Sequence, residues 1–92
     1  MQEKEIKRRL ESVVELLAAI EHERWSHWQK YLHGKCIRGD NGSLIIPADL
    51  AYRWAQQSAT RYADLSDEEK ESDREQVRGY LPVIERAFSD LV

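Results

Sequence analysis

The chain has few of the residues on which disulfides, metal sites and membrane spans depend. Cys36 is the only cysteine among 92 residues, so no internal disulfide forms and no second thiol exists to hold zinc. No apolar run approaches the roughly 18 residues of a membrane helix, and the charged start of the chain is unlike a secretory signal. These absences predict a soluble protein of the reducing cytoplasm.

An excess of positive charge is also missing. Fourteen basic residues face seventeen acidic ones, which gives a formal net charge of −3. Proteins that hold a nucleic-acid duplex by its phosphates need a basic surface, so the composition argues against a duplex-binding protein. The length predicts one domain, residues 1–92, with no room for a separate catalytic domain.

Helical periodicity is what the sequence does contain. Apolar residues at spacings of three and four predict one long helix from about Glu3 to His33, with Gly34 as its natural end. Few helix breakers interrupt the chain, which has two prolines and four glycines. A second helix is predicted from about Pro47 to Ala59, since proline suits a first helical turn.

The remaining segments predict a hairpin and a third helix. Asp40-Asn41-Gly42 is a turn signal between two short apolar arms, which is typical of a small β-hairpin. The run Ser66-Asp67-Glu68-Glu69 matches a capping box and predicts that a helix begins near residue 67. Gly79 and Pro82 predict a kink or break there, followed by a short helix to about residue 90. The predicted fold is all-α, with three main helices and a small hairpin between the first two.

The first helix carries charge where a core should lie. At about 100° per residue, Glu21 falls in the middle of an apolar face, and His22 and Arg24 fall at its edges. A carboxylate facing a core needs a partner. The apolar residues of this face are Leu10, Val14, Leu17, Ala18, Trp25, Trp28 and Leu32.

Inward charges recur on the third helix, where Lys70 and Asp73 share the apolar face and Arg74 lies at its margin. One interpretation is that the two helices neutralise one another, for instance through Glu21 with Arg74 and His22 with Asp73. The other is that some of these groups line a ligand pocket together with two indoles of the first helix. Indoles offer flat faces to a ring, and Arg or His offers donors to phosphate or carboxylate.

Metal binding and catalysis find little support in the pattern. His22, His27 and His33 lie five and six residues apart, so they point to different sides of the helix and do not share an ion. Cys36 beside His33 is not a nucleophile motif, and no cofactor fingerprint is present. Trp54 shares a helical face with other apolar residues and is interpreted as core.

Two motifs resemble the ryanodine-receptor repeat (RyR) domain. They are Ala19-x-Glu21-His22-x-Arg24-Trp25 and Tyr62-x-x-Leu65-Ser66-x-Glu68-Glu69-Lys70-x-x-Asp73-Arg74-x-x-Val77. The segment between them departs from the family, because it lacks the Gly-Trp-x-Tyr-Gly strand and the His-Pro-x-Leu-x-Pro segment. Bacterial and phage members of the family are understood to sense small ligands, nucleotide derivatives in particular. The resemblance carries over Glu21, His22, Trp25, Asp73 and Arg74 as residues with either a structural role or a ligand contact.

The leading hypothesis is a non-catalytic module for a small anionic ligand, most concretely a nucleotide or cyclic-oligonucleotide signal that the protein senses or, in a phage, sequesters. The predicted ligand-binding residues are His22, Arg24, Trp25, Trp28, Tyr62 and Arg74. The predicted structural network comprises Glu21, Lys70 and Asp73.

The alternative is a protein-interaction or self-assembly module, such as a homodimer, in which the inward charges are structural. It is suggested by Val13, Ile20 and Tyr31, which lie on a second apolar side of the first helix. An enzyme with His22 as a base ranks third, because no nucleophile, metal or cofactor motif accompanies it.

Overall fold

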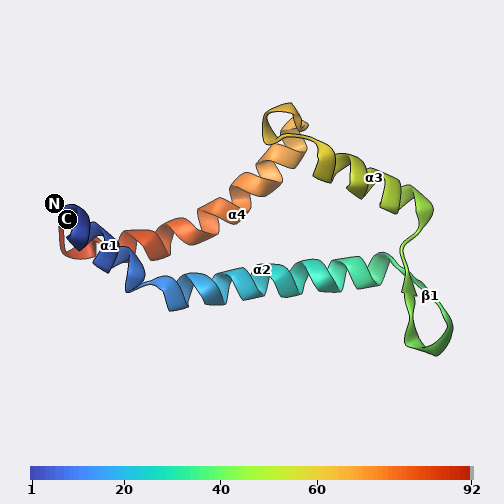
Figure 1. Ribbon diagram of the computed structural model, residues 1–92, viewed down its shortest axis with the longest axis horizontal. Helices are drawn as coiled ribbons and strands as arrows, with labels where there is room; N and C mark the ends of the chain where they lie inside the picture. The colour runs from blue at the N-terminus through green and yellow to red at the C-terminus, as the bar shows by residue number, and fades with distance from the viewer. Residues whose placement is uncertain (92) are drawn as a thin grey trace.

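The computed structural model describes residues 1–91, which form four α-helices and a two-stranded hairpin (Figure 1). The predicted helical class with one hairpin is therefore confirmed, although the number of helices is four rather than three. The helices and strands are α1 (Glu3–Glu11), α2 (Val14–Lys35), β1 (Ile37–Arg38), β2 (Leu44–Ile45), α3 (Ala48–Ala59) and α4 (Asp67–Arg86). Three short 3₁₀ turns are η1 (Asp40–Gly42), η2 (Tyr62–Asp64) and η3 (Ser89–Leu91).

The single N-terminal helix predicted from residues 3 to 33 is wrong, because the chain turns at Ser12 and Val13. The Ser12 hydroxyl donates to the backbone carbonyl of Arg9, a local bond that competes with regular helix. The Val13 amide donates to Leu10 O at 3.2 Å, three residues back, and its φ of −108° and ψ of 8° are not helical. Val13 is only 5 % exposed, so the turn is stabilised by burying its side chain at the corner. It does not belong to an open second side of the helix.

Arg9 ties this corner to the other end of the chain. Its Nη1 donates to the Ala87 carbonyl at 3.0 Å, and its Nη2 donates to Asp90 Oδ2 at 2.9 Å. Glu5, one turn earlier on α1, accepts from Arg9 Nη2 at 3.1 Å. Ala87 is 8 % exposed. The two ends of the chain consequently lie together, and α1 closes the end at which α2 and α4 meet (Figure 1).

The third predicted helix begins as expected but does not break. The Ser66 hydroxyl accepts from the Glu69 amide at 3.2 Å, and the Glu69 carboxylate accepts from the Ser66 amide at 3.2 Å, which confirms the capping box. Pro82 lies inside α4, which runs as one helix to Arg86. Of the predicted kink or break, the break and the separate terminal helix are therefore wrong. Proline removes a single backbone bond, and the apolar side chains on either side of it keep the helix against α2.

The hairpin forms where it was predicted, with arms of two residues. Ile37 pairs with Ile45, and Arg38 pairs with Leu44, in antiparallel register. The turn places Asn41 at φ 56° and Gly42 at φ 76°, the left-handed region that asparagine and glycine tolerate best. The left-handed end predicted at residue 34 is wrong, because α2 continues through it to residue 35 and residue 42 is the one glycine of the described chain with positive φ.

Together α2, α3 and α4 form an open frame rather than a closed bundle (Figure 1). The described chain spans 55 × 34 × 19 Å with a radius of gyration of 18.3 Å. Among its hydrophobic residues only Val13 and Ala87 are buried, and both lie at the corner where the termini meet. A single copy therefore lacks the core that a helical domain of this length normally has.

Candidate functional site

The inward face of α2 is one continuous stripe that two other helices approach at different places. We call it the inner stripe; its members on α2 are Val14, Leu17, Ala18, Glu21 and Trp28. Near the termini it faces α4, and at its far end it meets α3 (Figure 1). The stripe contains most of the apolar face predicted from the sequence, with Glu21 in its middle as expected.

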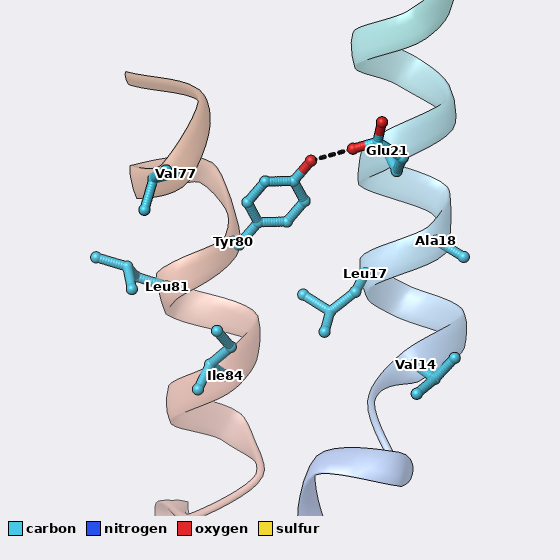
Figure 2. Close-up of a pocket in the computed structure, with 8 residues that line it drawn as sticks. All are labelled: Val14, Leu17, Ala18, Glu21, Val77, Tyr80, Leu81 and Ile84. Atoms are coloured by element: carbon cyan, nitrogen blue, oxygen red, sulfur yellow. Dashed lines mark hydrogen bonds between the residues drawn. The ribbon is translucent and has the colours of Figure 1, made fainter. Parts of the chain in front are cut away.

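An open groove of about 510 Å³ lies between α2 and α4 (Figure 2). Its walls are apolar except at one end, where a carboxylate on α2 meets a phenol on α4. We call it the α2–α4 groove; its lining residues are Val14, Leu17, Ala18, Glu21, Val77, Tyr80, Leu81 and Ile84.

The polar end of this groove is a cluster of Glu21, Arg24 and Tyr80. The Tyr80 hydroxyl donates across the groove to Glu21 Oε2 (Figure 2). Arg24 Nε donates to the same oxygen at 3.2 Å. The Arg24 guanidinium, and after it the Tyr80 hydroxyl, lower the pKa of Glu21 from 4.5 to about 2. The same bond raises the pKa of Tyr80, because the phenol must keep its proton to donate. Arg24 and Tyr80 are therefore the partners that the carboxylate of Glu21 was expected to need.

The cross-helix pairs predicted from the sequence are not the ones that form. Glu21 pairs with its own helical neighbour Arg24 rather than with Arg74, whose Nη1 instead donates to Glu71 at 3.2 Å. His22 lies 3.4 Å from Ser26 Oγ through its Nε2, and not beside Asp73. His22 and Arg74 have their partners three or four residues away on the same helix, because α2 and α4 spread apart beyond the α2–α4 groove (Figure 1). Glu21 lies within the groove and has a partner on each helix, Arg24 on α2 and Tyr80 on α4.

On the middle of α2, two aromatic rings stack in solvent. The rings of His22 and Trp25 have centroids 6.0 Å apart and planes 25° apart. Trp25 is 54 % exposed. This exposed pair offers a flat face that a planar ligand can extend.

A second groove, of about 530 Å³, lies where α2 meets α3. Trp28 and Trp54 form its indole walls, edge to face with centroids 5.5 Å apart and planes at 69°. Gln57 and Ser58 add polar groups, and Ala55 completes the lining. We call this the Trp28–Trp54 groove. Trp54, interpreted from the sequence as core, is one of its walls.

Tyr62 and Arg74, two of the residues predicted to bind ligand, lie near the start of α4 together with Lys70. Lys70 Nζ lies 5.9 Å from the centroid of the Tyr62 ring. The pKa of Arg74 is raised, chiefly by its hydrogen bond to Glu71 and also by Tyr62. Tyr62 is 49 % exposed. An aromatic ring flanked by two cations is a second surface that suits an anionic ring compound.

The six predicted ligand residues thus form two groups. His22, Arg24, Trp25 and Trp28 follow one another along α2, whereas Tyr62 and Arg74 share the other cluster with Lys70. The structure gives no contact between the groups in residues 1–91, and the start of α4 is well separated from α2 (Figure 1). Sequence reasoning missed Tyr80, Gln57 and Ser58. Of these, only Tyr80 left a signal, since it is a hydrogen-bond donor on the apolar face of its helix.

Comparisons with protein-family models, with curated proteins and with solved structures find no match to this chain. Within residues 1–91, no helix has both the length and the apolar character of a membrane crossing. In the same part of the chain, no group of three or more His, Cys, Asp or Glu side chains is arranged to hold a metal ion.

Proposed function

We propose that this protein is a non-catalytic module that binds a small anionic ligand bearing an aromatic ring, of the nucleotide or cyclic-oligonucleotide class. The observation that carries the proposal is the Trp28–Trp54 groove. Its two indoles stand at 69° to one another, so a planar base can stack on one and meet the edge of the other. Gln57, which lines the same groove, supplies the donor and acceptor that the edge of a base requires, and Ser58 Oγ, which donates to the Ala55 carbonyl, supplies a further acceptor.

The turn of α2 that precedes Trp28 offers a cation, Arg24, to the anionic part of such a ligand. Arg24 lies four residues before Trp28, about 6 Å along the helix axis, which is within the length of a nucleotide. Its guanidinium has five N–H donors, and its bonds to Glu21 use Nε and Nη2. A phosphate at this position therefore shares Arg24 with Glu21. His22 and Trp25 add an exposed pair of stacked rings beside Arg24 on α2.

The resemblance to the RyR domain supports the same ligand class independently of this groove. The family is understood to sense nucleotide derivatives, and the positions that carry the resemblance include His22, Trp25 and Arg74. Under this proposal Tyr62, Lys70 and Arg74 form a second anion-binding surface at the start of α4. A sensor or a sequestering protein needs no catalytic residue, which fits the absence of a nucleophile motif.

The proposal is tested by thermal unfolding of the protein with mono-, di- and cyclic nucleotides. A nucleotide at about a hundred times its dissociation constant adds roughly 2.7 kcal/mol to the free energy of unfolding. Gln57→Ala should weaken a hit at least tenfold without lowering the stability of the free protein, because its side chain lines the groove. Arg53→Ala, on the same helix but not among the groove residues, is the matched control.

Two results would contradict the proposal. If no nucleotide changes the unfolding temperature or the tryptophan fluorescence of the wild-type protein, the proposed ligand class is wrong. If a nucleotide binds equally well to Gln57→Ala, the ligand does not occupy the Trp28–Trp54 groove.

A further inference from the structure

The surface of one copy is too large for a chain of this size. A folded monomer of about 10.8 kDa is expected to expose roughly 5,500 Å². This chain exposes 7756 Å². The excess is about 2,200 Å² when the two values are subtracted. The radius of gyration agrees, at 18.3 Å against roughly 12 Å for a compact domain of 92 residues.

Part of the exposed apolar surface follows a regular pattern along the α2–α4 groove. On α2 the groove residues are Val14, Leu17, Ala18 and Glu21, and on α4 they are Val77, Tyr80, Leu81 and Ile84. Both sets have the spacing i, i+3, i+4, i+7, the pattern of a helix that packs into a bundle. Val77 is 55 % exposed and Leu81 is 46 % exposed, although both belong to this stripe. Two such stripes side by side are half of a four-helix core.

We infer that the α2–α4 groove is the interface between two copies of this chain, whose four long helices together complete one hydrophobic core. In a twofold interface the same surface serves both partners, so the occupant must itself present an apolar helical stripe. The two stripes of this chain meet that condition, since each spans the same two turns of helix. The inference does not rest on the proposed nucleotide binding, whose groove has no lining residue in common with this one.

The size of the excess exposed surface fits a second copy of the chain better than a short peptide. The excess of about 2,200 Å² belongs to the surface of the whole described chain, of which the groove is one part, and doubled over two copies it lies within the range that obligate homodimers bury. A partner of standard size covers only about 800 Å² on each side and would leave more than half of the excess in water.

The polar residues at the end of the groove fix where the contact stops. Tyr80 and Glu21 are hydrogen-bonded to one another across the groove (Figure 2). Arg24 donates to the same carboxylate, so these polar groups already have partners within one chain. At the other end, the groove residue Val14 directly follows the buried corner at Val13. The apolar length between the two ends is what a second copy covers.

The first test uses the wild-type protein without any nucleotide. Light scattering and sedimentation equilibrium should give about 21.6 kDa, twice the 10.8 kDa of one chain. The unfolding temperature should rise with protein concentration over a roughly hundredfold range, because folding and association are linked. A species of one-chain mass that unfolds cooperatively at a temperature independent of concentration would overturn the inference.

A pair of variants locates the interface on the groove. Leu81→Lys places a charge in the middle of the stripe and should shift the mass to one chain, with loss of helical signal. Ser72→Lys is the matched control, because it adds the same charge to an exposed position of α4 outside the groove. It should keep the mass of two chains. A Leu81→Lys protein that keeps the mass of two chains shows that the groove is not the interface, whatever its stability.

Discussion

The contact between Trp28 and Trp54 should hold α3 in place, so Trp54→Ala should release that helix. α3 has 12 residues, which is marginal for an isolated helix in water. An aromatic pair contributes about 1 kcal/mol beyond its buried area. Roughly 100 Å² of indole surface leaving contact adds up to about 2.5 kcal/mol, an upper value because part of that surface touches α3 itself. We expect a loss of about 2 to 3 kcal/mol, concentrated in α3.

Hydrogen exchange of backbone amides measures this loss helix by helix. A change of about 2 to 3 kcal/mol corresponds to an increase of roughly 30- to 140-fold in the exchange rates of α3 amides, since each 1.4 kcal/mol is tenfold. The amides of α4 should change much less. Tyr52→Ala is the control, because Tyr52 lies on the same helix and is 70 % exposed, so truncation there should cost within about 0.5 kcal/mol. Unchanged α3 exchange in Trp54→Ala would refute the view that the indole pair docks the helix.

Three further predictions concern single interactions, and each is checked by thermal or urea unfolding followed by circular dichroism. Ser66→Ala should lower stability by about 1 kcal/mol, or roughly 4 to 8 °C, whereas Ser66→Asp should keep the cap. Because the pKa of Glu21 is lowered from 4.5 to about 2, its ionised form stabilises the fold above about pH 4.5. That contribution should fall away between pH 4.5 and pH 2, and Glu21→Gln should lack this part of the acid dependence. Gly79→Ala should add up to about 1 kcal/mol, because it lies within α4 and a Cβ there meets no atom within 4 Å, while Gly42→Ala should destabilise the turn that holds it at φ 76°.

Local chemistry made the ends of elements predictable. The capping box at Ser66 and the turn at Asn41 and Gly42 each depend on residues within four positions of one another, so the sequence contains their whole cause. The α1–α2 corner depends on a partner almost eighty residues away. Arg9 reaches Ala87 and the end of the chain only once the helix has turned, and nothing near Ser12 in the sequence indicates that contact.

The candidate site was predictable in composition but not in arrangement. Placing Glu21 on the apolar face of α2 correctly required a partner for its carboxylate, and the partners are Arg24 and Tyr80. Arg74 was predicted instead because the two helices were assumed to lie together along their whole length. They lie together only near the termini, and beyond the α2–α4 groove the charges pair within their own helices. A helical projection gives the face of a residue but not how far along it the next helix remains in contact.

The open frame separates the two proposed activities along one rigid helix. The α2–α4 groove uses the first two turns of α2, whereas the Trp28–Trp54 groove lies near its other end. A second copy at the first groove therefore leaves the second accessible from the side of α3. Stabilisation by a nucleotide should then add to stabilisation by protein concentration rather than replace it, because the two grooves have no lining residue in common. If raising the protein concentration instead weakened nucleotide binding, the two surfaces would overlap, and the assignment of one of them would have to move.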